Sequence, residues 1–165
     1  MSFHAGDTVM HWTYGLGQVL RKEVRALSGS KMLYYAVQMG VLTVWVPADD
    51  NLDSRLRSPT SQSDFKKLLH LLSAPGEPLP DDRHERKIRL LALLRDGRAE
   101  SLCRVIRDLC AYRHVRSLND NDQTLLKQAQ NALLGEWGFV LSVTPAQAQI
   151  EMQRLLAIGS PEKEE

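Results

Sequence analysis

The hydrophobic periodicity of the chain changes once along its length, and this change limits the folds that the chain can adopt. Between residues 7 and 46, apolar and polar residues alternate with the period of two that is typical of strands. In Lys31–Met39, for example, every second residue from Leu33 onward is large and apolar. After Pro59 the apolar residues recur every three or four positions, as in an amphipathic helix. We therefore expect a β domain followed by a helical domain.

The first part of the sequence predicts four short antiparallel strands. Turn signals separate them at Gly15–Gly17, Ser28–Ser30 and Gly40. Pro47 closes the last strand, because proline cannot donate to a β-ladder. Four strands in about 45 residues indicate a small, strongly bent sheet or an SH3-like or Tudor-like barrel. Trp12 and Tyr14 are interpreted as core residues of this barrel.

The second part predicts a compact bundle of about five helices. Their expected N-caps are Ser61, either Asp81 or Asp82, Asn119 and Thr144. The clearest apolar stripe runs along the third helix, about Ala99–Tyr112, with Cys103 and Cys110 as small core residues and Arg107 in solvent. The predicted fold is therefore α+β. A Tudor-like or SH3-like β domain covers residues 1–57, the helical bundle covers residues 58–160, and residues 161–165 form an acidic tail.

The composition is that of an average globular protein. Of the 165 residues, 43% are hydrophobic and 25% are charged. Apolar runs such as Leu90–Leu94 are far shorter than the roughly 20 residues that a membrane span needs. Met1–Asp7 has neither the basic start nor the apolar segment of a secretory signal. We expect a cytoplasmic protein that does not contact a membrane.

The net charge of +1 conceals one basic segment. Residues 83–116 contain 10 Lys and Arg against 4 Asp and Glu. Such a segment fits a nucleic-acid-binding patch, and it fits equally a pair of solvated helices with Arg-rich outer faces. Charge alone does not separate these two interpretations.

The sequence contains no recognisable catalytic, cofactor-binding or metal-binding pattern. The five histidines lack the spacing of a zinc site, and Gly15–Gly17 lacks the third glycine of a dinucleotide motif. The acidic residues within 49–53 fit a solvated loop better than a metal cluster. Cys103 and His114 fit a core thiol and a helix-end histidine better than a nucleophile and its base. We therefore expect no enzymatic activity, no cofactor and no metal.

Short segments in both halves of the chain form an ordered set. In the β part they are Phe3–Val9, Tyr14-Gly15, Leu42–Pro47 and Leu56-Arg57, and in the helical part they are Leu72–Pro75, Ile106–Leu109 and Leu118 with the helix that reaches Leu134–Glu136. Their order and spacing over residues 3–156 resemble the CarD/CdnL family of bacterial transcription regulators. The N-terminal domain of that family is similar to the polymerase-interacting module of transcription-repair coupling factors.

The resemblance implies two partners. The β domain would dock on the β subunit of RNA polymerase by adding its sheet edge to the partner's sheet. The helical domain would contact promoter DNA at the upstream edge of the transcription bubble, where the family wedges a tryptophan into the minor groove. The implied outcome is a more stable open complex, without ligand, metal or nucleotide. We expect a monomer that is associated with the nucleoid through polymerase.

For polymerase binding, the resemblance points to Arg25, Thr43, Trp45 and Pro47. Arg25 stands where family members often have an arginine late in the second strand. Trp45 stands where they often have a second arginine, shortly before the Val-Pro pair. The alternation around Trp45 leaves two orientations open, since the ring can point outward as an interface anchor or pack beneath the linker.

For DNA binding, the resemblance points to Arg83, Arg86, Lys87 and Arg89. Arg83 stands at the position of the wedge tryptophan, so we expect weak DNA binding without sequence preference. An alternative is a divergent paralogue that docks on polymerase or another protein without engaging DNA. A sequence-specific repressor is less well supported, because the sequence has no helix-turn-helix signature.

Overall fold

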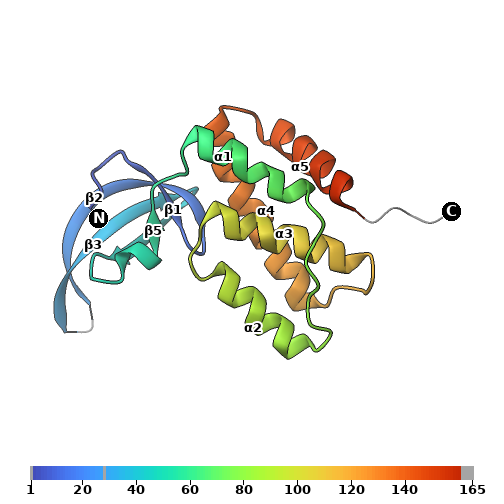
Figure 1. The fold of residues 1–165 in the computed structure, drawn as a ribbon. Coiled ribbons are helices and arrows are strands. Elements are labelled where there is room, and N and C mark those ends of the chain that lie inside the picture. The colour runs from blue at the N-terminus through green and yellow to red at the C-terminus, as the bar shows by residue number, and fades with distance from the viewer. Residues whose placement is uncertain (1, 28, 161–165) are drawn as a thin grey trace. The chain divides into compact units, whose positions relative to one another are not determined.

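The computed structural model describes residues 2–27 and 29–160, and within them the chain forms a five-stranded antiparallel sheet followed by five α-helices (Figure 1). The strands are β1 (Thr8–His11), β2 (Gly15–Leu27), β3 (Ser30–Met39), β4 (Leu42–Pro47) and β5 (Leu56–Arg57). The helices are α1 (Gln62–Leu68), α2 (Arg83–Leu94), α3 (Ala99–Arg113), α4 (Asp120–Leu141) and α5 (Pro145–Gly159), with 3₁₀ turns η1 (Leu52–Ser54) and η2 (Leu69–Ser73). The α+β prediction is confirmed.

Backbone contacts divide the chain into two units, with the division between Pro59 and Thr60. The predicted boundary, between residues 57 and 58, lies two residues earlier. The predicted acidic tail, residues 161–165, lies outside the described residues. None of the described helices is long and apolar enough to cross a membrane.

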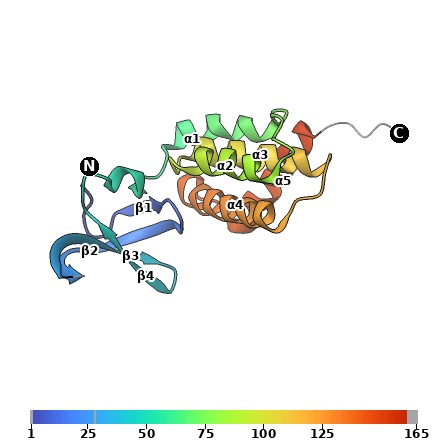
Figure 2. The same cartoon turned by 90° about the horizontal axis from the view of Figure 1, so that it is seen from below.

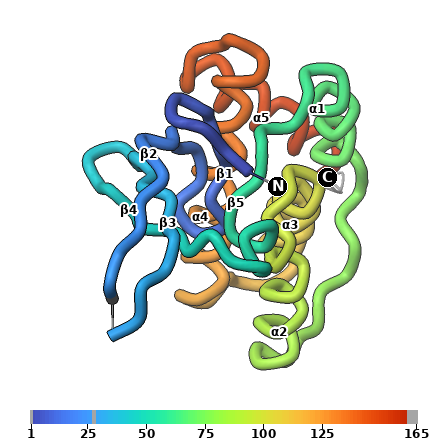
Figure 3. Tube along the Cα trace, turned by 90° about the vertical axis from the view of Figure 1, so that its left-hand side faces the viewer, coloured from blue at the N-terminus to red at the C-terminus, as the bar shows by residue number. Residues whose placement is uncertain are grey.

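The strands of the first unit follow the order β4-β3-β2-β1-β5, and all neighbouring pairs are antiparallel. β2 and β3 run side by side as a long hairpin (Figure 3). Gly40 begins the tight turn from β3 to β4 with a φ of 59°, a left-handed conformation that favours glycine. The two-residue strand β5 pairs with β1 and was not among the four predicted strands.

One face of the sheet forms the core of this unit. Its buried residues are Phe3, Val9, Val19, Tyr35, Val37, Met39, Val46, Leu52 and Leu56. The ring of Phe3 packs edge-on against that of Tyr35, with centroids 5.8 Å apart. Leu52 and Leu56 belong to η1 and β5, so the segment that follows β4 is part of the β domain.

The interpretation of Trp12 and Tyr14 as core residues is wrong. Both lie in the turn between β1 and β2, and 57% and 55% of their surfaces are exposed. The buried ring of His11 organises this turn, because its Nδ1 accepts hydrogen bonds from the backbone N–H of Thr13 (3.0 Å) and Tyr14 (3.2 Å). The turn therefore directs the two large rings into solvent.

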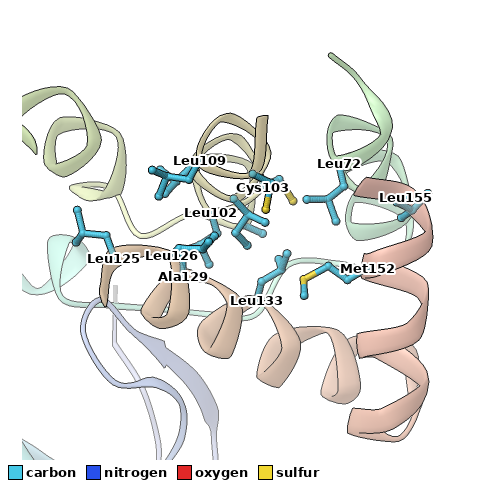
Figure 4. Packing of buried hydrophobic residues seen from close by; sticks show 14 of the residues in the cluster. Leu72, Leu102, Cys103, Leu109, Leu125, Leu126, Ala129, Leu133, Met152 and Leu155 are labelled. Carbon is cyan, nitrogen blue, oxygen red and sulfur yellow. The ribbon is translucent and has the colours of Figure 1, made fainter. Parts of the chain in front are cut away.

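The helices of the second unit surround α3, which contacts α1, α2 and α4 (Figures 1 and 2). Apolar side chains from α3, α4, α5 and η2 interdigitate in the core (Figure 4). Cys103 and Cys110 are buried there, as predicted. Trp137 is also buried and packs edge-on against Phe65, with ring centroids 6.0 Å apart.

The expected N-caps hold, and two other expectations need correction. Ser61, Asp82, Asn119 and Thr144 each accept a backbone N–H with the side chain at the start of a helix. The first predicted helix, however, divides into α1 and η2. Arg107 is buried rather than solvated, and its Nε donates to the carboxylate of Asp108 at 2.9 Å.

Candidate functional site

The strand β4 presents three of the residues predicted to bind polymerase on one face of the sheet. Side chains alternate between the two faces of a strand. Val46 is buried in the core of the β domain, and Val44 packs against that core. Thr43, Trp45 and Pro47 therefore project from the opposite, outer face. Of these three, Thr43 is exposed and the other two are half-buried.

The pairing register brings β2 arginines to the same outer face. Trp45 is opposite Ala36 on β3, and Ala36 is opposite Arg21 on β2. Arg25 follows Arg21 by four residues, an even spacing that keeps it on the same face. The structure thus gathers Arg25, Trp45 and their neighbours into one surface, which we call the outer-face site.

Two guanidinium groups approach the ring of Trp45. The Cζ of Arg25 is 4.0 Å from the ring centroid, and that of Arg21 is 5.3 Å away. Cation–π contacts of this kind contribute about 0.5–1 kcal/mol at exposed sites. Arg21 is also paired with Glu23, at 2.8 Å. Trp45 is therefore an outer-face residue that positions Arg25.

Arg25 has no ion pair within the described residues, so its N–H groups can meet an acidic partner. Sequence reasoning missed Arg21 as a member of this site. The even spacing of Arg21 and Arg25 in a predicted strand was the available signal, because it places both on one face.

Among the described strands, β4 is the outermost on its side of the sheet. The N–H of Ala48 donates to the carbonyl of Leu33 at 2.9 Å. In an antiparallel ladder, paired residues alternate between hydrogen-bonded and non-hydrogen-bonded positions. Thr43 and Trp45 occupy the second kind of position, so their N–H and C=O groups point away from β3. Pro47 occupies the same kind of position, so its lack of an N–H costs no hydrogen bond between β4 and β3.

Arg86, one of the residues predicted to contact DNA, does not lie on the surface. It is buried, with 3% of its surface exposed. Its Nε and Nη2 donate to the two carboxylate oxygens of Asp122, at 3.0 Å and 2.8 Å. Its Nη1 donates to the carbonyls of Pro80 and Asp81 and to the hydroxyl of Tyr112.

The prediction that Arg86 binds a phosphate is therefore wrong, because its guanidinium is buried and hydrogen-bonded inside the helical unit. The hydrogen bonds to Asp122 raise the pKa of Arg86, so the side chain stays charged. Asp122 also belongs to the capping box that begins α4. The pair thus fastens the start of α2 to the start of α4.

The other three predicted DNA-contacting residues are exposed on α2 but do not form one group. Arg83 and Lys87 are one helical turn apart and share a side of the helix. Within the described residues neither forms an ion pair. Arg89 lies on another side, where it donates to the carbonyl of Pro78 (3.0 Å) and approaches Glu77 (3.6 Å). Of the four predicted residues, only Arg83 and Lys87 offer a joint contact to phosphates.

No cluster of His, Cys, Asp or Glu that could hold a metal occurs in residues 2–27 and 29–160. Burial raises the pKa of the Cys103 thiol to about 12, so this residue is a protonated core side chain rather than a nucleophile. His114 is exposed at the end of α3 and lies near the hydroxyl of Ser160, at 3.4 Å.

Comparison with known proteins places the chain in a family. A family model described as "CarD, C-terminal domain" matches residues 67–153, which include α2, α3 and α4. The chain is also 24% identical over 148 residues to a Bacillus subtilis (strain 168) protein named "Putative transcription factor YdeB". That alignment covers 88% of this chain and 96% of the Bacillus protein. This chain therefore belongs to the CarD family of transcription regulators.

Proposed function

We propose that the protein docks on the β subunit of RNA polymerase through its β domain and stabilises promoter open complexes through its helical domain. It would act as a monomer in the cytoplasm, associated with the nucleoid through polymerase, and would catalyse no reaction. Family membership supports a role in transcription. The observation that supports docking most is the Arg25–Trp45 contact, at 4.0 Å, beside the outermost strand β4.

Docking would combine backbone pairing with side-chain contacts. An added strand can pair with the outward N–H and C=O groups of Thr43 and Trp45. The ring face of Trp45 restrains the Arg25 side chain, which lowers the conformational entropy that Arg25 loses on binding. The partner surface that fits best has an exposed strand edge and a carboxylate opposite Arg25.

The DNA contact would be made by Arg83 and Lys87. Both are exposed cations at the start of α2, and an arginine can enter a narrow minor groove or bind a phosphate. Asp82 accepts the N–H of Glu85 at this helix start, so two carboxylates lie beside the cations and weaken the attraction to DNA. We expect binding that is weak and does not depend on sequence.

A second candidate function is docking on polymerase, or on another protein, without DNA contact. The burial of Arg86 and the engagement of Arg89 with Glu77 and Pro78 favour it, because they leave two of the four predicted cations for DNA. Both candidates share the same docking surface, so the docking experiment comes first.

The docking experiment measures the affinity of the full chain for the purified β subunit. Arg25→Glu and Trp45→Ala change the outer-face site. Lys31→Glu is the matched control, because Lys31 is an exposed cation of the same hairpin that projects from the opposite face. Truncating a central interface tryptophan often costs about 2 kcal/mol or more. We expect Arg25→Glu and Trp45→Ala to weaken binding at least tenfold and Lys31→Glu to leave it unchanged. Equal affinities for the folded variants would exclude this surface.

A further inference from the structure

A groove on the helical unit lies outside the sites described above. It has a volume of about 650 Å³, which is within the range of ligand sites. Most of its lining comes from one side of α4, between Gln123 and Leu134. The rise from Gln123 to Leu134 makes this wall about 16 Å long. Arg113, Ser117 and Leu118 line the groove from the end of α3 and the loop after it, and Gln149 from α5.

The charged residues that line the groove are all positive. Its lining includes two cations, Arg113 and Lys127, and no Asp or Glu among the described residues. Both cations are exposed, and neither forms an ion pair within the part of the chain that the structure describes. Four other surface cations of this unit, Arg89, Arg104, Arg116 and Arg154, are paired with a carboxylate. The groove therefore favours an anionic ligand.

The remaining lining residues are amides and leucines. The amides are Gln123, Gln130, Asn131 and Gln149. A carboxamide both donates and accepts hydrogen bonds, which matches the alternating donors and acceptors of a peptide backbone. Leu118, Leu126 and Leu134 add apolar surface that can cover an aliphatic side chain. These features call for a ligand that is anionic, partly apolar and rich in amide groups.

We propose that this groove binds an acidic peptide segment of another protein. Carboxylates of the segment meet Arg113 and Lys127, its backbone meets the amides of α4 and α5, and aliphatic side chains cover the leucines. A groove about 16 Å long accommodates roughly five residues of extended chain. The site is separate from the outer-face site and from Arg83 and Lys87, so it would recruit a further protein partner.

A nucleic acid fits the groove less well, although it is also anionic. Nucleic-acid sites that track a backbone use several cations, whereas this groove has two. Single-strand sites also stack bases on aromatic rings, and no aromatic residue lines this groove among the described residues. The amides can donate to phosphate oxygens, but the three leucines have no role with a phosphate backbone. The composition of the lining thus favours a peptide.

The test titrates full-length, isotopically labelled protein with three probes and follows the side-chain amide signals of Gln123, Gln130, Asn131 and Gln149 by NMR. The first probe is a pool of eight-residue peptides in which glutamate alternates with aliphatic residues. The second is the matched pool with lysine in place of glutamate. The third is an eight-nucleotide oligothymidylate. A chain that ends at Ser160 is titrated in parallel, to remove competition from the three glutamates within residues 161–165.

We expect the glutamate pool to shift the groove amides and the lysine pool to leave them in place. Lys127→Glu and Arg113→Glu should each weaken this binding at least fivefold. Lys66→Glu, an exposed cation on α1 outside the groove, should not. The proposal is overturned if the glutamate pool leaves the groove amides unshifted, if Lys66→Glu weakens binding as much as Lys127→Glu, or if the oligonucleotide binds more tightly than the glutamate pool.

Discussion

Arg86 and Arg89 stand three residues apart on α2, yet their environments differ. Arg86 is buried and bound to Asp122, whereas 42% of the Arg89 side chain is exposed. Removing one partner of a buried ion pair leaves an uncompensated charge and typically costs about 3–5 kcal/mol. An exposed pair contributes about 0–1 kcal/mol. Two neighbouring arginines of similar appearance in the sequence thus have different roles.

This contrast predicts the effect of substitution on stability. Arg86→Ala should lower the free energy of unfolding of the helical unit by about 3 kcal/mol or more, and Arg89→Ala by less than about 1 kcal/mol. Denaturant titration followed by circular dichroism measures both values. The double variant Arg86→Met with Asp122→Leu should recover much of the loss, because it removes both charges. Equal losses for the two alanine variants would contradict the buried pair.

His11 gives the β domain a pH-dependent stability. Its Nδ1 accepts two backbone hydrogen bonds, which requires the neutral ring, and burial lowers the pKa of His11. The unfolded chain has a histidine pKa of about 6.5. Above that pH both states are neutral and the stabilisation is complete. As the pH falls below it, the unfolded state takes up the proton first, and the stabilisation is lost until the pH passes the folded-state pKa.

We therefore expect amide exchange in β1 and β2 to become faster, relative to its intrinsic rate, between pH 7.5 and 5.5. His11→Asn should reduce this dependence, because an asparagine oxygen can accept turn N–H groups without titrating in this range. Hydrogen-exchange NMR measures the effect, and His4, which is exposed, provides the control variant His4→Asn. A wild-type profile that is identical to that of His11→Asn would refute this role.

At the scale of elements, the connection between the units is short. η1 and β5 belong to the β domain through Leu52 and Leu56, and Thr60 donates to Glu136 of the helical unit with both its N–H and its hydroxyl, at 2.8 Å each. β5 ends at Arg57, which pairs with Met10, so only Ser58 and Pro59 lie between the two anchored segments. We propose that the two units fold independently on either side of them.

Limited trypsin digestion checks this proposal. We expect the first cleavage to follow Arg57 and to give two fragments that resist further digestion, since each keeps its own core. Cleavage within 48–55 should be slower, although this segment has exposed loop residues, because Leu52 holds it against the sheet. Digestion without a stable fragment on either side of residue 57 would indicate one cooperative unit.

The features that the sequence predicts well are those with local causes. The change of period identifies the β and helical parts because a strand face repeats every two residues and a helix face every 3.6. The caps at Ser61, Asp82, Asn119 and Thr144 depend on contacts within three residues. β5 was not predicted because a strand of two residues is too short to show an alternation of apolar and polar residues.

The features that the sequence does not predict depend on distant partners. Arg86 is buried because Asp122, 36 residues later, reaches it. The contact between Arg25 and Trp45 needs the register of three strands, which the alternation alone does not supply. Trp12 and Tyr14 were misplaced because their aromatic character does not distinguish a strand from a turn. The sequence could therefore predict which positions belong to the candidate site, but it could not predict the contacts between them.

At the scale of the whole molecule, the number of free cations sets the salt dependence of any DNA contact. Each phosphate that is neutralised contributes about −0.9 to the slope of log K against log salt. With Arg83 and Lys87 as the joint contact, we expect a slope near −2, where four cations would give about −4. The affinity of polymerase for promoter DNA is measured across salt concentrations with and without the protein, and the difference between the two slopes gives this value.

Two substitutions at position 83 separate the DNA-contacting and docking-only candidates. Arg83→Ala should shorten the lifetime of polymerase–promoter complexes mildly, because it removes one cation. Arg83→Trp should lengthen it, because an apolar ring can unstack a base step in the minor groove. Lys66→Ala, at an exposed position on α1, is the control. If all these variants match the wild type at low salt, the docking-only function is the better account.

The proposed docking requires the open edge of β4 to pair with a strand of the polymerase β subunit. The outward N–H of Thr43 is needed for pairing with polymerase but not for the pairing of β4 with β3. Thr43→Pro therefore removes a hydrogen bond to polymerase and leaves the β3–β4 ladder intact. Val44→Pro removes an N–H that faces β3 and serves as the control for damage to the sheet. The decisive measurement is the affinity of folded Thr43→Pro for the β subunit. We predict that the affinity falls at least tenfold while the unfolding midpoint stays unchanged. An affinity equal to that of the wild type would exclude strand pairing at this edge.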